Sequence, residues 1–331
     1  MVKSTQTAEL LGKIQDKDRQ SLARLISLVE RESPDVPEIM RQIQPRLGHA
    51  HCVGVTGPPG AGKSTLVDRM TAVLRQQKFS VGIIAVDPTS PFSGGAVLGD
   101  RIRMQQHYLD EGVFIRSMAT RGSHGGLPRT VRGVIKLLDA FGKDFILVET
   151  VGVGQTELDI MEASDTVVVA LVPEAGDTVQ TMKAGLMEIA DIFVVNKADR
   201  EGANYLVAEL MAMLRMYPKQ SYWEVPVLAT QAVNNVGIDE LCQKVTGHRQ
   251  TLQETGQLTQ RRQAQRKREF FQTVEQKVTS RLIQLIETDG QLTSYLERVE
   301  KGQIDPYSAS IEIIKNKELL VNWLQGIERE G

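Results

Sequence analysis

Residues 51–76 read HCVGVTGPPGAGKSTLVDRMTAVLRQ, and this stretch decides the fold. Its first six residues are mostly apolar and predict a buried strand, whereas the residues after Gly62 have the apolar spacing of a helix. Between them, Gly57 to Ser64 match the pattern G-x-x-x-x-G-K-[ST]. In this pattern the glycines let backbone N–H groups turn inward around phosphates, and the following helix contributes the positive end of its dipole. The stretch therefore predicts a strand, a phosphate-binding loop and a helix, in that order.

Two side chains of this loop carry charge and metal-binding chemistry. We expect Lys63 to reach the β- and γ-phosphates of a nucleotide, and the Ser64 hydroxyl to ligate Mg²⁺. The other residues expected to contact the nucleotide are Gly57, Pro58, Pro59, Gly60, Ala61, Gly62 and Thr65. The motif by itself does not choose between ATP and GTP.

The chain beyond this stretch continues to alternate between short β-rich runs and helical stretches, as far as about residue 245. Several runs are almost continuously apolar, which is typical of strands buried on both faces of a parallel sheet. The further runs lie at residues 80–86, 112–118, 144–150, 165–171, 191–196 and 225–230. We therefore predict an α/β fold with a doubly wound, mostly parallel sheet.

Both ends of the chain read as helices. In the N-terminal part, Ser33-Pro34 has the pattern of a helix N-cap followed by proline at the first helical position. In the C-terminal part, Asp305-Pro306 predicts the start of the last helix in the same way. We predict three regions, namely an N-terminal helical extension at 1–48, a nucleotide-binding domain at 49–247 and a C-terminal helical dimerisation extension at 248–331.

Composition excludes several other classes of protein. The 331 residues include 39 basic and 41 acidic ones, a net charge of −2, which argues against binding to nucleic acid as the main function. The two cysteines, Cys52 and Cys242, lie too far apart in the chain to suggest a disulfide framework, so we expect a reducing compartment. The first residues lack the apolar core of a secretory signal, and the longest apolar runs are too short to cross a bilayer. We expect a cytoplasmic protein with no membrane insertion.

A second motif predicts which base is bound. Asn196-Lys197-Ala198-Asp199 is an N-K-x-D sequence directly after a predicted strand, at the edge where α/β folds bind ligands. The Asp199 carboxylate can accept hydrogen bonds from N1–H and the amino group of guanine, whereas adenine offers neither donor. The stem of Lys197 can lie over the base. A loop stabilised by an Asx turn is the alternative interpretation.

The loop after the last predicted strand belongs to the same expected site. Gln231-Ala232-Val233 looks like a variant of the Ser-Ala-Lys loop that contacts the guanine carbonyl O6 through backbone N–H groups. The side chains depart from that pattern, and a contact made by the backbone tolerates the departure.

Residues 149–157 are the candidate γ-phosphate sensor, because Glu149-Thr150-Val151-Gly152 ends a strand where most GTPases carry Asp-x-x-Gly. We expect Glu149 to hold Mg²⁺ through water and the Gly152 N–H to contact the γ-phosphate. Gln155 can orient water, but it is not adjacent to Gly152, where Ras-like enzymes carry their catalytic glutamine. Val153 occupies that place, so we predict slow intrinsic hydrolysis.

Two aspartates after the second strand are further candidates for the ion. Asp87 ends that strand, and Asp100 follows a glycine-containing stretch. Either can bind Mg²⁺ or its water, and the alternative for each is a helix N-cap or a surface ion pair.

These motifs together resemble the MeaB/ArgK family of GTPases, in the SIMIBI class. The matching segments, spread over about residues 50–245, read GPPGAGKST, VDPTSPFSGGAVLGDRIRM, RGSHGGLPR, ETVGVGQTE, PEAGDTVQTMKAG and NKAD. The resemblance implies a GTP- and GDP-binding chaperone of an adenosylcobalamin-dependent mutase, of the methylmalonyl-CoA mutase type, that gates cofactor loading or protects the mutase. It also implies a homodimer formed through the C-terminal extension, and a mobile segment at Pro173 to Lys183 that communicates with the partner.

Two other functions remain open from the sequence. Members of the same family have been labelled as an ATP-dependent kinase or ATPase linked to lysine/arginine/ornithine transport, although Asp199 speaks against ATP. Relatives in the same class deliver metals, and His49-Ala50-His51-Cys52 has metal-ligand residue types. Because Cys52 lies in a predicted strand, an ordinary core residue is the preferred interpretation. The basic run that begins at Arg261-Arg262 predicts a solvated helix face, with a partner surface as the alternative interpretation.

Overall fold

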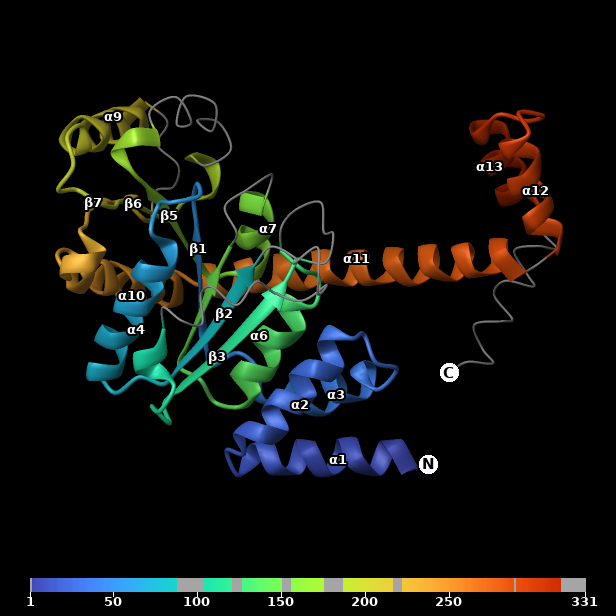
Figure 1. Ribbon diagram of the computed structural model, residues 1–331, viewed down its shortest axis with the longest axis horizontal. Helices are drawn as coiled ribbons and strands as arrows, with labels where there is room; N and C mark the ends of the chain where they lie inside the picture. The colour runs from blue at the N-terminus through green and yellow to red at the C-terminus, as the bar shows by residue number, and fades with distance from the viewer. Residues whose placement is uncertain are drawn as a thin grey trace. The chain divides into compact units, whose positions relative to one another are not determined.

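All seven apolar runs form strands, and among the described residues these strands build one sheet (Figure 1). The computed structural model describes residues 2–87, 104–120, 127–150, 156–175, 187–216, 222–288 and 290–316. The strands are β1 (His51–Thr56), β2 (Val81–Asp87), β3 (Val113–Ala119), β4 (Phe145–Glu149), β5 (Thr166–Leu171), β6 (Ile192–Val195) and β7 (Val227–Ala229). The predicted α/β fold is confirmed.

The order of the strands explains where a ligand site forms. The order is β3-β2-β4-β1-β5-β6-β7, and every pairing between these strands is parallel. Every residue of β1, β2, β4, β5 and β6 is buried, as the continuous apolar runs predict. The chain builds the β2 side of β1 first and then crosses to β5 on the other side. Ligands of such sheets bind at the carboxyl edge beside this change of direction, which here is the end of β1.

Helices cover both faces of the sheet. In Figure 1, α4 (Lys63–Gln76) and α10 (Ile238–Glu254) lie on one face, and α6 (Val131–Ala140) and α7 (Thr156–Ala163) lie on the other. A further helix, α9 (Ala203–Met216), connects β6 to β7. The amphipathic stretch after the glycine loop thus becomes α4, whose apolar side chains Leu66, Val67, Met70 and Leu74 are fully buried.

The N-terminal helices share the core of the sheet domain. They are α1 (Val2–Gln15), α2 (Arg19–Glu30) and α3 (Val36–Ile43), and the fully buried Leu22, Leu25 and Ile39 belong to the same hydrophobic cluster as α6. The predicted helix start at Ser33-Pro34 is two residues early, since α3 begins after Asp35. The Ser33 hydroxyl instead accepts a hydrogen bond from the Asp35 N–H at 3.3 Å, which closes a turn before the helix.

Two ion pairs fix the start of α11 (Gln257–Thr288) to the amino-terminal ends of β5 and β6. Arg262 donates to both carboxylate oxygens of Asp165, at 2.9 and 2.7 Å, and Arg261 donates to both oxygens of Asp191, at 3.0 and 2.8 Å. Both aspartates are buried, and each also accepts a backbone N–H. The prediction of a solvated helix face is therefore wrong for these two arginines, because their counterions come from distant parts of the chain.

The described residues form two compact units, one within residues 1–262 and the other within residues 263–331. In the second unit the rest of α11 is followed by α12 (Gly290–Glu300) and α13 (Pro306–Lys315), with Leu292 and Ala309 buried. Asp305 caps α13 by accepting N–H bonds from Tyr307 and Ser308, so the predicted start at Asp305-Pro306 is confirmed. The three-part division at residues 48 and 247 stays a prediction. Within the described ranges, no helix combines the length and the apolar character needed to cross a membrane.

A buried histidine lies beside these ion pairs. His51, at the start of β1, is 1% exposed, and its Nε2 lies 2.8 Å from the Thr166 hydroxyl. Its Nδ1 is 3.7 Å from an Asp165 oxygen. Burial lowers the pKa of His51 to about 4, and the opposing attraction of Asp165 does not restore it. The imidazole is therefore neutral in the folded protein at neutral pH.

This histidine makes the fold sensitive to acid. The unfolded chain binds the His51 proton with the ordinary pKa of 6.5, while the folded protein binds it only near pH 4. Above pH 6.5 the titration of His51 has no effect on stability. As the pH is lowered between these two values, the free energy of unfolding falls by about 3 kcal/mol, because the unfolded chain binds a proton that the folded protein does not. We expect His51→Gln, which can still bond Thr166, to flatten this slope in urea denaturation at several pH values. The exposed His49→Gln is the control, and equal slopes in both variants would contradict the assignment.

Candidate functional site

The phosphate-binding loop begins where β1 ends, at the carboxyl edge of the sheet. Gly57 has a φ of 137°, and a Cβ at this position would lie 1.9 Å from the carbonyl oxygen of Ala170 in β5, so only glycine fits. Lys63 opens α4 and is buried, and its Nζ donates to the carbonyl oxygens of Gly57 at 2.9 Å and Pro58 at 3.1 Å. The loop therefore holds a buried ammonium group against its own backbone.

Oxygen ligands gather beside this loop. The Ser64 hydroxyl donates to a carboxylate oxygen of Glu149 at 2.6 Å. Glu149 ends β4, the neighbour of β1, and Asp87 ends β2, the neighbour of β4. All three side chains are buried, with 4–6% exposed. The structure thus joins Ser64 to Glu149 and places Asp87 at the same edge of the sheet.

One side-chain amide connects the phosphate-binding loop to the loops of the predicted base site. Asn196 follows β6, and its Nδ2 donates to the carbonyl oxygen of Ala61 at 2.8 Å. Its Oδ1 accepts from the backbone N–H of Ala232 and from the Thr230 hydroxyl, both at 3.1 Å. A Cβ on Gly62 would lie 2.4 Å from the Asn196 nitrogen, so the loop needs a glycine for this approach. Asn196 is buried and thereby fixes three separate loops together.

In the rest of the N-K-x-D motif, Lys197 and Ala198 are half-buried and only Asp199 is exposed. Lys197 takes a left-handed conformation, with φ of 56°, and the N–H of Ala198 donates to the Thr230 carbonyl at 2.9 Å. Asp199 comes next and is exposed. The turn at Lys197 thus leaves the Asp199 carboxylate accessible at the edge of the sheet, where a base can reach it.

The loop after β7 is a tight turn whose N–H groups have different partners. The Gln231 N–H donates to the Val236 carbonyl at 3.0 Å, and the Ala232 N–H donates to Asn196. Of the three predicted base contacts in this loop, only the Val233 N–H carries no bond to another described residue. The Val233 side chain is also exposed. Among the described residues, Val233 is therefore the member of this loop whose N–H is available for the expected contact to a base carbonyl, which stays a prediction.

Several predicted site residues lie outside the described residues. They are Gly152 and Gln155, together with Val153, in the segment after Glu149, and Asp100 in the segment after Asp87. Pro173 and its two successors form a short 3-10 helix, while the remainder of the predicted mobile segment, from residue 176 to Lys183, is outside the described ranges as well.

A hydroxyl pair beside the loop was not predicted. The Thr150 hydroxyl donates to the Thr56 hydroxyl at 2.9 Å, and both residues are completely buried, with at most 1% exposed. The available signal was the position of each threonine, since one directly precedes the glycine loop and the other directly follows Glu149.

Two other features take no part in the candidate nucleotide site. His51 and Cys52 are buried in β1, and burial raises the pKa of the Cys52 thiol far above its usual range. The part of the chain that the structure describes holds no metal-binding cluster of His, Cys, Asp and Glu.

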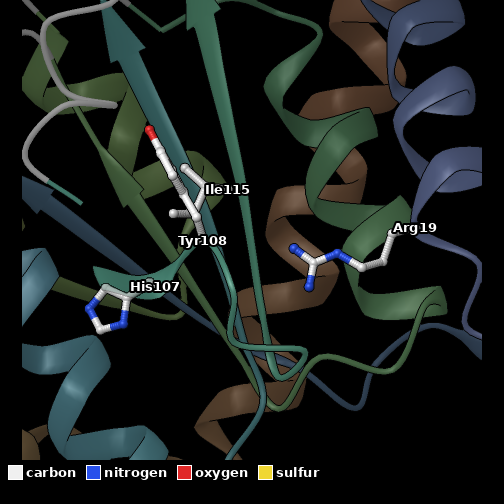
Figure 2. A pocket seen from close by; sticks show the side chains of 4 residues that line it. All are labelled: Arg19, His107, Tyr108 and Ile115. Carbon is white, nitrogen blue, oxygen red and sulfur yellow. The ribbon is translucent and has the colours of Figure 1, made fainter. Parts of the chain in front are cut away.

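Figure 2 shows a pocket beside the edge strand β3, lined by Arg19, His107, Tyr108 and Ile115. The His107 ring bonds to Asp68 of α4 rather than serving the pocket, and no predicted site residue lines it.

A phosphate-binding loop on the central strand, linked by one amide to an N-K-x-D loop two strands away, defines a P-loop nucleotide-binding protein of the GTPase type. Comparison with known proteins narrows this class. The family model of the methylmalonyl Co-A mutase-associated GTPase MeaB matches residues 22–287. The chain therefore belongs to the MeaB family and is a GTP-hydrolysing P-loop protein.

Similar proteins extend over almost the whole chain. A protein of Pyrococcus abyssi named as a GTPase is 50% identical over 310 residues, which cover 93% of this chain and 95% of the relative. The GTPase ArgK of Escherichia coli is 33% identical over 314 residues, 92% of this chain and 95% of that protein. The crystal structure of a LAO/AO transport system kinase has a TM-score of 0.71 and 28% identity, covering 94% and 97% of the two chains.

The Asn196 junction leads to a direct prediction. Replacing Asn196 by alanine leaves the Ala61 carbonyl and the Ala232 N–H without this partner in the interior. We expect the free energy of unfolding to fall by about 1–3 kcal/mol and guanine nucleotide affinity to fall at least about tenfold. Urea denaturation and fluorescent-nucleotide titration measure the two effects.

The matched control is Asn234→Ala, which removes an exposed amide in the same loop. It should leave stability and affinity close to those of the unmodified protein. If Asn196→Ala binds GTP as tightly as the unmodified protein does, the amide does not hold the two halves of the site together.

Proposed function

We propose that this GTPase is a chaperone that regulates, protects or loads cofactor into an adenosylcobalamin-dependent mutase of the methylmalonyl-CoA mutase type. The observation that carries the nucleotide part is the junction at Asn196, which makes phosphate binding and base recognition parts of one structure. The family, whose description names a methylmalonyl-CoA mutase-associated GTPase, supports the partner.

In this proposal the ligand is GTP or GDP. Residues 57–65 hold the phosphates through backbone N–H groups and the Lys63 ammonium. Asp199 accepts hydrogen bonds from N1–H and the amino group of guanine, and the Val233 N–H bonds its carbonyl O6. Adenine leaves the Asp199 carboxylate without these donors, which disfavours ATP.

The oxygen ligands beside the loop fit Mg²⁺, which prefers carboxylate and hydroxyl oxygens. Ser64 holds the ion directly, and Glu149 and Asp87 hold it or its waters, with Asp100 a further candidate. The short bond between Ser64 and Glu149 shows that both side chains reach one point beside the loop. When bound, the ion neutralises charge on the phosphates.

Hydrolysis depends on the segment after Glu149. The Gly152 N–H contacts the γ-phosphate, and Lys63 stabilises negative charge on the β- and γ-phosphates. Val153 cannot orient water, and Gln155 stands further along the chain than the glutamine of Ras-like enzymes. We therefore propose a slow intrinsic rate, which makes the bound GTP a long-lived signal to the partner.

We also propose a homodimer formed through the C-terminal helices. Phe271, Val274 and Val278 lie at helical spacing on α11, and each is exposed, by 58%, 43% and 39%. An apolar stripe of this kind on a helix favours burial against a second helix.

The homodimer is tested by changing that stripe. We expect light scattering to give twice the chain mass for the unmodified protein and the single chain mass for Phe271→Glu, because a carboxylate in the seam is desolvated. Ser280→Glu, an exposed change on the opposite side of the same helix, is the control. A monomeric unmodified protein, or a dimeric Phe271→Glu variant, would count against this seam.

The partner is tested with a purified adenosylcobalamin-dependent methylmalonyl-CoA mutase. We expect the immobilised GTPase to retain the mutase, with an amount that differs between GDP and a non-hydrolysable GTP analogue. Lys63→Ala should lose the difference, because it weakens phosphate binding. No retention in either state would refute the mutase as partner and leave the GTPase activity intact.

The same samples distinguish the other functions. With γ-labelled nucleotide, a hydrolase releases only free phosphate, whereas a kinase transfers the label to a protein or small acceptor. The name of a similar protein, the LAO/AO transport system kinase, is the reason for testing the kinase alternative. Stoichiometric zinc or nickel binding that is lost in Cys52→Ala would favour a metal-delivery GTPase instead.

A further inference from the structure

The pocket beside β3 is a cavity of about 320 Å³ to which no residue of the proposed nucleotide site contributes (Figure 2). This volume is at the lower end of the range for ligand sites, roughly 300–1,000 Å³. The walls come from three separate parts of the chain. Arg19 opens α2, Tyr108 follows the short 3-10 helix Gln105–His107, and Ile115 lies in β3, an outermost strand of the described sheet. The cavity is therefore formed by the folded chain and not by one loop.

Arg19 gives the pocket a positively charged wall. One of its N–H groups donates to the carbonyl oxygen of Asp110 at 3.1 Å, and the guanidinium lies 5.9 Å from the centre of the Phe114 ring. Among the described residues, Arg19 makes no other hydrogen bond and no ion pair with a carboxylate. A guanidinium has five N–H donors, so most of those of Arg19 remain available to a ligand.

Two other half-buried arginines near this edge have the partner that Arg19 lacks. Arg75 donates to both carboxylate oxygens of Asp110, at 2.8 and 2.9 Å. Arg116, the residue after Ile115 in β3, pairs with the Glu30 carboxylate. The fork of N–H groups in a guanidinium matches the two oxygens of a carboxylate or a phosphate. An oxyanion in the pocket would give Arg19 the same kind of partner.

A buried lysine adds positive charge near Arg19. Lys143 is 4% exposed, and its Nζ donates to the Gly112 carbonyl at 2.7 Å, with no ion pair to a carboxylate of the described residues. Burial, followed by the charges of Arg19 and Arg75, lowers the pKa of Lys143 to about 8. The attraction of Asp110 opposes this only in part. The cations therefore repel one another, and a bound anion would offset that repulsion.

The acidic side chains of the surrounding turns do not neutralise Arg19. Three of them accept hydrogen bonds from other groups: Asp18 from the Ser21 N–H, Asp110 from Arg75, and Asp144 from the Ser80 N–H. Glu111 is exposed and forms no ion pair with a described residue. The negative charge that would complement Arg19 is thus absent from the described part of this region.

We propose that this pocket is a second ligand site, which binds a small molecule carrying an oxyanion, a carboxylate or a phosphate, next to a planar or apolar body. Arg19 binds the oxyanion through the N–H groups that it does not use within the protein. The body lies against Ile115 and the ring of Tyr108, whose side chain is 43% exposed. The site is separate from the proposed GTPase site, and the inference does not rest on that function.

Calorimetric titration of the full-length protein tests the ligand class with three probes of similar shape: benzoate, phenyl phosphate and the uncharged benzyl alcohol. Saturating GDP and Mg²⁺ keep phenyl phosphate out of the phosphate-binding loop. We expect at least one of the two oxyanion probes to bind about tenfold or more tightly than benzyl alcohol, because only they accept charged hydrogen bonds from Arg19. The tighter of the two identifies the ligand as a carboxylate or a phosphate.

Variants then assign the binding to the pocket. Arg19→Gln should weaken the oxyanion probes by about tenfold or more, and Arg19→Lys, which keeps the charge and loses the fork, should lie between. Tyr108→Ala should weaken the same probes by about two- to tenfold through loss of the ring contact. Arg24→Gln removes an exposed cation of the same helix and should leave the affinities within about twofold. Melting temperatures confirm that each variant is folded.

Three results would overturn the second site. They are no binding of either oxyanion probe at millimolar concentration, equal affinity for benzyl alcohol, and an Arg19→Gln variant that binds as tightly as the unmodified protein. If Arg19→Gln does not fold, the comparison of the three probes and the Tyr108→Ala variant still decide. Failure of the unmodified protein to bind GDP would refute the proposed function alone, because the benzoate titration does not depend on nucleotide.

Discussion

The Asn196 amide is the interaction on which the proposed nucleotide site depends. Phosphate-binding and base-reading sequences lie more than a hundred residues apart, and neither alone selects a nucleotide. The amide bonds the Ala61 carbonyl on one side and the Ala232 N–H on the other, and it is buried away from competing water. A buried bond of this kind fixes the distance between the phosphate loop and the base loop, so that one ligand can span them.

The sheet makes this short connection possible. Because the strands of the described residues are all parallel, the loops after β1, β4, β6 and β7 emerge at one edge, and the proposed site is assembled from their first residues. At the opposite edge, Asp165 and Asp191 hold Arg262 and Arg261, which ties the second turn of α11 to the starts of β5 and β6. The strand β5 carries Ala170, which lies against Gly57, and β6 is followed directly by Asn196. These two strands therefore connect the start of α11 to the candidate site.

Much of the fold could be predicted from local pattern, because buried parallel strands are continuous apolar runs and the glycine loop has a fixed sequence context. The cap at Asp305 was predictable for the same reason, since its partners lie two and three residues away. The start of α3 was misplaced by two residues because both Ser33 and Asp35 can cap a helix, and only the folded chain decides between them.

The contacts that could not be predicted join residues far apart in the sequence. Arg262 and Asp165 are 97 residues apart, and Thr150 and Thr56 are 94 apart. A run of arginines indicates a solvated helix face when the carboxylates that pair with it lie far away in the sequence. Within the candidate site, Ser64, Glu149 and Asn196 were predicted from motifs, whereas the bonds that connect them depend on the order of strands in the sheet.

Calorimetric titration with GTP, ATP and XTP tests the central claim most directly, namely that one connected site selects guanine. We predict that the unmodified protein binds GTP more tightly than ATP by more than about a hundredfold, because Asp199 has donors to bond only in guanine. Asp199→Asn should shift the preference to XTP, since the amide can donate to the xanthine C2 carbonyl. Equal affinity for ATP and GTP, or an unchanged preference in Asp199→Asn, would contradict this assignment.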